Sequence, residues 1–325
     1  MTMHPAFAVI ASGVALAACA ATTATAQSWP ARPVRVIIPF PPGGGSDLLG
    51  RPVAQKLTDA FGQQFIVDNR GGANGIIGTD LAARSRPDGY TLLVGSTAMS
   101  SNASLYHKLP YDTLNSFAPI SLFGNMPYFL ATNPSLPVTS VKELVALAKA
   151  QPGKINFGSA GVGGTPHLSG EMFNAQAGVK LVHVPYKGAA ESIIDLIAGQ
   201  VQVMFTGLPA LGPHARAGKL RLIAVAQPAR SPLMPDVPTF AESGLQGFEV
   251  GSWFGIFSPA GVPPALQARL AAEIARAVQS KEVQERYLGG GVEPLWNTPD
   301  QFRVFFRDDV VKWAKVVKES GARAE

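Results

Sequence analysis

The sequence predicts a mixed α/β protein of two lobes, each a doubly wound and mostly parallel sheet flanked by helices. Short apolar runs alternate with segments of helical periodicity, which is the pattern of βαβ units. The length of 325 residues is typical of two domains. Two glycine-rich loops, 39–47 (PFPPGGGSD) and 158–167 (GSAGVGGTPH), each lie between a strand-like run and a helix, one in each half of the chain.

The first half begins with a run typical of a buried strand, 34–40 (VRVIIPF), bounded by Pro33 and Pro41. After the first glycine-rich loop, apolar spacing predicts a helix over 48–60. The other elements expected in this half are strands over 65–67 and 91–94, a helix over 76–84, and extended segments over 119–123 and 128–132.

The second half repeats this alternation. Pro152 and Gly153 stop the first helix, and apolar residues from Ala190 to Ile197 fall at helical spacing. The expected helices are 141–150, 167–177, 190–197, 264–279 and 299–320, and the expected strands are 155–157, 181–184, 201–205, 220–225 and the extended run 248–257.

Composition excludes several classes of protein. Hydrophobic residues make up 46% and charged residues 15%, which rules out a disordered chain. A single cysteine rules out an intramolecular disulfide framework and a multi-cysteine metal site. The formal net charge of +5 comes from basic residues that form no cluster, so a nucleic-acid partner is not expected.

The N-terminal segment is predicted to be an export signal. Residues 1–26 contain no Asp, Glu, Lys or Arg, and their apolar core is shorter than the ~20 residues of a membrane-spanning helix. Ala24-Thr25-Ala26 predicts cleavage after Ala26. An alternative is lipidation at Cys19, because Leu16-Ala17-Ala18-Cys19 is similar to a lipoprotein processing site. No later run is long and apolar enough to span a bilayer, so the mature protein is expected to be soluble.

The two glycine-rich loops indicate an anion site. Each lies where a parallel strand ends and a helix begins, which is the edge of an α/β sheet that binds ligands. Glycine lets backbone N–H groups approach a ligand, and a helix start adds unpaired donors and a positive dipole end. Ser159 and Thr165 are candidate hydroxyl donors, with bonding inside the loop as the equal alternative. Asp47 is predicted first as a helix N-cap, and His167 as a neutral hydrogen-bonding or packing residue.

Motifs that would make the loops enzymatic do not match. The second loop lacks the third glycine of a dinucleotide fingerprint, neither loop is followed by GKS or GKT, and no G-x-S-x-G elbow surrounds Ser46 or Ser159. The histidines at 107, 167, 183 and 214 lack the close spacing of metal ligands. Neither a cofactor, nor a metal site, nor a set of catalytic residues is therefore predicted.

Several motifs occur in order along residues 29–325: the loop at 39–47, VDNR at 67–70 followed by glycines, RPDGYTL at 86–92, the loop and helix start at 158–168, and VPYKG at 184–188. With 248–259 and the Pro263-Pro264 helix start, they make the chain resemble the periplasmic substrate-binding proteins of tripartite tricarboxylate transporters, the TctC-like or Bug family. The sequence departs from the family pattern at Gly71, where Pro is common, and at Gly164, where Ser or Thr is usual. Contact at Gly164 would therefore have to be through the backbone.

The resemblance implies a periplasmic-binding-protein fold of the Venus-flytrap type. Residues 29–127 and 252–325 would form lobe one and residues 128–251 lobe two, with crossings near 126–129 and 250–253. It also implies a ligand carboxylate held by backbone N–H groups, hydroxyls and bridging waters. The implied positions are Phe40, Gly44, Gly45 and Asp47 in lobe one and Ser159, Gly163, Gly164 and Thr165 in lobe two, to which strand-end position adds Thr97, Asn102 and Thr206, and Tyr186 as a possible wall of the cleft.

The function that the resemblance implies is a periplasmic receptor that captures a small carboxylate and delivers it to the membrane permease subunits of a tripartite transporter. Two alternatives remain open. One is a sensor subunit that presents its ligand state to a membrane signalling protein. The other is a hydrolase or lyase using Asp47, His167 or Ser159, for which the sequence shows no nucleophile paired with an oriented base. The sequence does not specify which carboxylate is bound.

Overall fold

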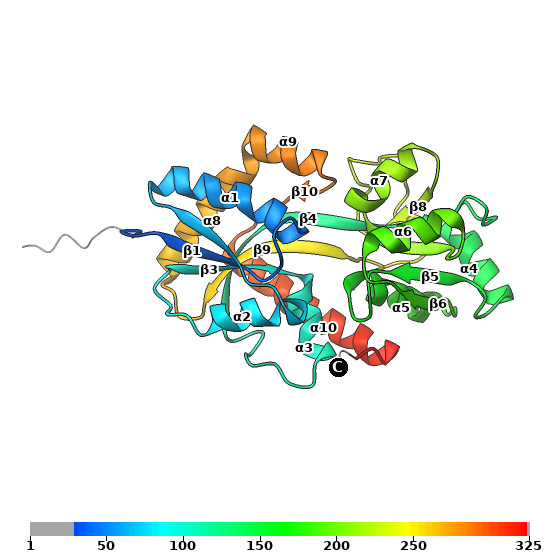
Figure 1. Ribbon diagram of the computed structural model, residues 1–325, viewed down its shortest axis with the longest axis horizontal. Coiled ribbons are helices and arrows are strands. Elements are labelled where there is room, and N and C mark those ends of the chain that lie inside the picture. The colour runs from blue at the N-terminus through cyan, green and yellow to red at the C-terminus, as the bar shows by residue number, and fades with distance from the viewer. Residues whose placement is uncertain (1–28, 324–325) are drawn as a thin grey trace, which may run out of the picture.

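The computed structural model describes residues 29–323. The predicted export segment, its cleavage after Ala26 and the alternative lipidation at Cys19 lie outside these residues. Two lobes lie side by side, each a sheet with helices on its faces, and long strands run from one lobe to the other (Figure 1). The predicted two-lobe α/β fold is confirmed.

The strands are β1 Val34–Ile38, β2 Phe65–Asn69, β3 Thr91–Ser96, β4 Phe117–Thr132, β5 Asn156–Ser159, β6 Val182–Pro185, β7 Val203–Gly207, β8 Arg221–Val225, β9 Gly251–Pro259 and β10 Glu293–Pro294. The helices are α1 Gly45–Phe61, α2 Ile76–Ala83, α3 Thr97–Leu105, α4 Val141–Ala150, α5 Thr165–Ala177, α6 Ala189–Ala198, α7 Leu208–Arg216, α8 Pro264–Gln279, α9 Lys281–Gly289 and α10 Pro299–Ser320, with a 3-10 turn η1 at Ala73–Gly75.

Strand β4 joins the sheets of the two lobes. In lobe one, β2, β1 and β3 are parallel, β9 is antiparallel to β3, and β4 pairs antiparallel with β9 from Phe117 to Pro127. From Tyr128 onward, β4 pairs antiparallel with β7 and β8 of lobe two, where β5 and β6 run parallel to β7. The outer strands of each lobe are therefore parallel, as predicted, whereas every pairing that involves β4 or β9 is antiparallel. The two extended segments expected over 119–132 are one strand, whose register shifts absorb its irregular pattern.

The sequence did not predict helices α3, α7 and α9. Helix α3 buries Ser100, Ser101 and Asn102, so its buried face is polar and gives no apolar period. Helix α7 contains an internal proline, and α9 buries only two side chains. Their formation depends on tertiary packing, which short helices need in water.

Helix α10 packs against both lobes, as its course beneath the crossing strands shows (Figure 1). In its first half, Phe302 and Phe306 join a core cluster with Phe257 of β9. In its second half, Trp313 joins the core cluster of lobe two, which includes Phe173 of α5. The predicted assignment of all of 252–325 to lobe one therefore does not describe the second half of α10, and the other lobe boundaries remain a prediction.

The crossing strand β9 is tied to the same helix. Trp253 Nε1 donates a hydrogen bond to Asp309 Oδ2 at 2.7 Å, and both residues are buried. A hydrogen bond to a buried carboxylate is stronger than a neutral one. Helix α10 is thus fixed to the strand that connects the lobes and to the core of lobe two.

We expect Trp313→Ala to lower the free energy of unfolding by ~3–5 kcal/mol, because it removes a fully buried indole from a packed core. Urea denaturation followed by circular dichroism measures the change. Val311→Ala is the matched control, since Val311 lies on the same helix and is 65% exposed. Equal effects of the two substitutions would contradict the assignment of Trp313 to the lobe-two core.

Candidate functional site

A cavity of about 390 Å³ lies between the lobes, and we call it the cleft cavity. Its volume is in the range of small-molecule sites. Strand-end loops of lobe one, the start of α5 in lobe two and the crossing strands form its walls. The lining residues are Phe40, Pro41, Gly44, Gly45, Ser46, Asn74, Ser96, Thr97, Ala98, Met126, Thr165, Ser252 and Phe254.

Three helices begin at this cavity. Gly44, Ser96 and Gly164 are the N-caps of α1, α3 and α5, and none of them supplies a side-chain hydrogen bond to its helix. Ser46 and Thr165 of the first turns line the cavity. The first N–H groups of a helix have no partner within it, and the helix dipole places partial positive charge there. The cavity therefore has the electrostatics of an anion site.

The lining that the structure describes contains no Lys or Arg. Its polar groups are backbone amides, hydroxyls and one amide side chain, that of Asn74. An anion in this cavity would be held by hydrogen-bond donors and helix dipoles rather than by an ion pair.

Asp47 stabilises the first glycine-rich loop through hydrogen bonds to its carboxylate. Its Oδ2 accepts hydrogen bonds from Gly43 N at 3.0 Å and Arg51 Nε at 2.9 Å, and its Oδ1 accepts from Asn69 Nδ2 at 2.9 Å. Asn69 Nδ2 also donates to Phe40 O at 3.0 Å. Burial acts to raise the pKa of Asp47, but the hydrogen bonds from Arg51, Gly43 and Asn69 outweigh it and hold the pKa below its usual value.

The predicted N-cap role of Asp47 is wrong, because α1 begins at Gly45 and Asp47 is its third residue. Asp47 is 3% exposed, and its carboxylate oxygens are occupied by groups of the chain itself. The structure therefore gives Asp47 a positioning role and no free oxygen for a ligand.

Thr97 and Asn102 stabilise the start of α3 through hydrogen bonds. Thr97 Oγ1 accepts from Trp253 N at 3.0 Å and donates to Gly251 O at 3.2 Å, which ties α3 to β9. Asn102 is buried, donates to Asn74 O at 3.0 Å and accepts from Asn74 Nδ2 at 2.8 Å. Thr97 and Asn74 line the cavity, whereas Asn102 does not and acts through Asn74.

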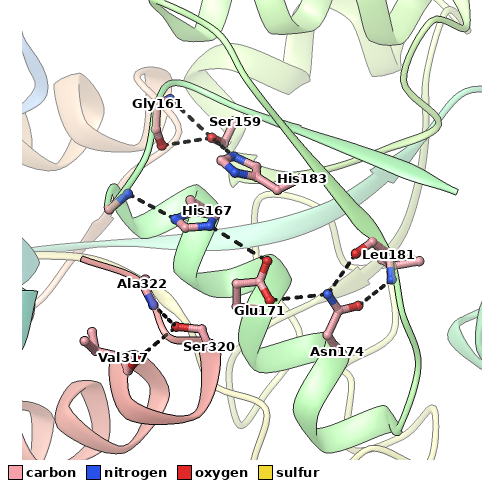
Figure 2. A network of polar contacts seen from close by, with 11 residues as sticks. Ser159, Gly161, His167, Glu171, Asn174, Leu181, His183, Val317, Ser320 and Ala322 are labelled. Carbon is pink, nitrogen blue, oxygen red and sulfur yellow. Dashed lines mark hydrogen bonds and ion pairs between the residues drawn. The ribbon is translucent and has the colours of Figure 1, made fainter. Parts of the chain in front are cut away.

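Ser159 bonds within its own loop. Its Oγ lies 3.0 Å from Gly161 O, 3.2 Å from Gly161 N and 2.6 Å from His183 Nε2 (Figure 2). All three contacts are satisfied when Oγ–H donates to Gly161 O and Oγ accepts from Gly161 N–H and His183 Nε2–H. The sequence predicted no Ser–His pair, and the structure forms one. In this arrangement, however, Nε2 carries a proton and cannot act as a base toward the serine.

His167 supports the same loop. Its Nδ1 accepts a hydrogen bond from Gly163 N at 3.0 Å, and its Nε2 lies 3.8 Å from Glu171 Oε1 (Figure 2). Its ring stacks on His183 with centroids 3.9 Å apart. Burial lowers the pKa of His167, so the ring is neutral and Nδ1 is free to accept. The predicted hydrogen-bonding role of His167 is confirmed, and its predicted neutrality agrees with the lowered pKa.

Of the other predicted positions, some lie at the cleft cavity and some do not. Gly163, with φ of 77°, and Gly164 form the end of the second loop, next to Thr165 in the cavity wall. Tyr186 donates its hydroxyl to Asp195 Oδ2 at 2.7 Å and does not line the cavity. Thr206 lines a neighbouring cavity instead.

Sequence reasoning missed several lining residues. Asn74 lies in the segment Gly71–Gly75 after β2, so an asparagine among glycines at the binding edge of the sheet was the available signal. Ser252 and Phe254 lie on β9, whose Ser252 Oγ is 3.0 Å from Tyr128 Oη. No local pattern distinguishes such strand residues from core residues. The other residues missed are Pro41, Ser46, Ser96, Ala98 and Met126.

Within residues 29–323, no group of three or more His, Cys, Asp or Glu side chains is arranged to hold a metal ion. In the same range, no helix combines the length and apolar character needed to cross a bilayer.

We expect acid to destabilise the protein through the stacked histidines. Burial and the neighbouring His167 ring lower the pKa of His183 from 6.5 to about 4. The unfolded chain therefore takes up a proton near pH 6.5, whereas the folded chain does so near pH 4. The stability contributed by the neutral ring is complete above about pH 6.5 and is lost as the pH falls toward about 4. The melting temperature of wild type should fall more steeply in this interval than that of His183→Gln.

Thermal melts at a series of pH values measure both slopes. His107→Gln is the control, because His107 is an exposed histidine of α3's C-terminal flank. Parallel curves for wild type and His183→Gln would contradict the prediction.

Comparison with known proteins agrees with this geometry. The family model described as the tripartite tricarboxylate transporter family receptor, TctC, matches residues 49–322. Protein BugT of Bordetella pertussis is 40% identical over 325 residues, which cover 99% of this chain and 99% of that protein.

Solved structures are similar over most of the chain. The adipate complex of Rpa4515 from R. palustris has a TM-score of 0.77 and 34% identity, covering 91% of this chain and 99% of that one. MatC from Rhodopseudomonas palustris with bound malate has a TM-score of 0.73 and 30% identity, covering 89% and 99%. This chain belongs to the tripartite tricarboxylate transporter receptor family, with the Bug proteins among its relatives.

Proposed function

We propose that this protein is a periplasmic receptor that captures a small carboxylate in the cleft cavity and delivers it to a tripartite-type membrane transporter. One observation carries the proposal. Three helix N-termini without side-chain caps, from both lobes, meet at one cavity whose described lining has no basic side chain. A carboxylate matches such a site in charge, size and number of hydrogen-bond acceptors.

The binding free energy available is sufficient for a receptor. Hydrogen bonds to a charged group contribute about 1.5–3 kcal/mol each. Each helix N-terminus adds about 0.3–1 kcal/mol, and up to ~2 kcal/mol when partly buried. Four or five such contacts exceed the cost of association and leave about −8 kcal/mol, which corresponds to a micromolar Kd.

Capture would close the cleft. Gly44 and Gly45 belong to lobe one and Thr165 to lobe two, so an anion between them contacts both lobes. A ligand shifts an equilibrium toward the form that it binds more tightly. The closed form brings both sets of donors to the same carboxylate, and hinge closure of this kind is an established response of two-lobed binding proteins.

Related proteins support the ligand class and the location. Rpa4515 and MatC bind adipate and malate, which are both small carboxylates. A structure 36% identical to this chain is described as a periplasmic transporter, and the 34% identical BugD as a periplasmic binding protein. The partners expected are the permease subunits of the transporter. The ligand should leave unchanged, because the Ser159–His183 pair is arranged as a loop brace.

We expect one or more organic acids to raise the melting temperature of the purified mature protein. A ligand at 100 times its Kd stabilises the folded state by about 2.7 kcal/mol. Tryptophan fluorescence provides a second readout, because Trp253 lies on crossing strand β9 and Trp313 belongs to a core cluster with Leu130 of crossing strand β4. The amide of each active acid is the control and should produce no shift. Failure of every acid in a broad panel, including acidic amino acids, would refute the proposal.

We expect Gly44→Asp to abolish or greatly weaken carboxylate binding while the fold survives. The backbone angles at Gly44, φ −74° and ψ 168°, suit any N-cap residue, and an added Cβ would lie 3.4 Å from Pro41 O. The new carboxylate would occupy the N–H groups of α1 and repel an anion, with an affinity loss of at least ~10-fold.

Gly44→Asn is the matched control, because it has the same shape without the charge and should lose less affinity. Calorimetric titration of the acid that stabilises wild type measures both. Gly163 is a poorer choice for this test, because its φ of 77° would strain any other residue. Unchanged affinity in Gly44→Asp would place the ligand elsewhere.

A further inference from the structure

A second cavity, of about 420 Å³, adjoins the cleft cavity, and we call it the apolar chamber. Gly45, Met126 and Phe254 line both cavities, so the two share a wall. This chamber also lies between the lobes, since Leu48 of α1 and Ala210 of α7 both line it. A ligand held at the helix starts of the cleft cavity therefore has the chamber directly beside it.

The chamber combines apolar walls with one cation. The apolar side chains are Leu48, Leu49, Pro209, Ala210 and Val292. Leu48 is 50% exposed, so the chamber leaves uncovered apolar surface that a ligand could bury. Ligand sites are typically apolar cavities in which a few polar groups fix the orientation of the ligand.

Arg286 of α9 is that polar group. It lines the chamber and is exposed, and it forms no ion pair within residues 29–323. The acidic residues of its own helix are paired elsewhere, Glu282 with Lys56 and Glu285 with Lys281. Its guanidinium is therefore available to a carboxylate, which it can bind through two hydrogen bonds.

The shared wall is adaptable. The side chain of Met126 lies over Gly207, where an added Cβ would be 2.7 Å from both its Cγ and its Sδ. Phe254 lies over Gly45 in the same way, with its ring 3.4 Å from the position of an added Cβ. Glycine at 207 makes room for Met126, whereas a Cβ at position 45 would meet Phe254 at an ordinary contact distance. Methionine, being unbranched and flexible, can repack around a ligand that passes it.

Resting on the proposed function, we infer that the preferred ligand is an elongated dicarboxylate with an apolar middle. Its first carboxylate lies at the helix N-termini of the cleft cavity. Its hydrocarbon body passes Met126 into the apolar chamber, and its second carboxylate meets Arg286. Burial of the apolar body and the charge-assisted hydrogen bonds at the far end then select long diacids over short acids.

Calorimetric titration of the mature protein with acetate, succinate, octanoate and suberate tests this inference. The four acids are short and long chains with one or two carboxylates. In wild type, suberate should bind most tightly. Arg286→Gln should weaken suberate at least ~10-fold and leave acetate and octanoate within about 2-fold. Arg86→Gln is the matched control, because Arg86 is an exposed arginine that lines neither cavity.

Ala210→Phe should fill the chamber and weaken the binding of octanoate and suberate, while the binding of acetate and succinate should not change.

The melting temperature without ligand checks that each variant is folded. If suberate and succinate bind equally well and neither Arg286→Gln nor Ala210→Phe changes the affinity for suberate, the assignment of the chamber is overturned while carboxylate capture stands. If none of the four acids binds wild type, and no other acid stabilises it, both proposals are overturned.

Discussion

The proposed binding site depends on one constraint, that three helix starts without side-chain caps meet at a single cavity. Ser140 caps α4, and Thr298 caps α10 in a complete capping box, so the chain uses side-chain caps elsewhere. At the cleft cavity, Gly44, Ser96 and Gly164 supply none. Glycine in place of a Ser, Thr or Asp cap costs a helix only about a few tenths of a kcal/mol, so Gly44 and Gly164 leave these starts uncapped at little cost in stability. Helices α2, α6, α7, α8 and α9 also lack a side-chain cap, so α1, α3 and α5 are distinguished by the meeting of their starts at one cavity.

Several polar side chains stabilise these loops by bonding within the chain and do not line the cleft cavity. Asp47 and Asn69 hold the first loop, while His167, His183 and Ser159 hold the second. Rigid support of this kind keeps backbone donors in place before a ligand arrives, and preorganised donors bind more tightly than mobile ones. In the proposed binding mode, the backbone would recognise the group that carboxylates share, and side chains farther along the cleft could differ without disturbing it.

The glycine-rich loops and the strand–helix alternation were enough to predict the fold class and the position of the cleft, because both are local in sequence. The roles of individual polar residues were not predictable in the same way. Asp47 is satisfied by Asn69, 22 residues away, and Ser159 by His183, 24 residues away. Helix α3 was not predicted, because its buried face carries serines and an asparagine and so shows no apolar periodicity. These features depend on contacts between distant segments, which a single sequence does not reveal.

The two-sided packing of α10 limits how the lobes can move. Asp309 joins the helix to crossing strand β9, and Trp313, one turn farther on, is embedded in the core of lobe two. Opening by a wide swing would have to pull this indole out of its core, so we expect the ligand-free protein to sample a narrow set of openings. A receptor that already samples few geometries loses little conformational entropy when it binds, and the same hydrogen bonds then give a higher affinity.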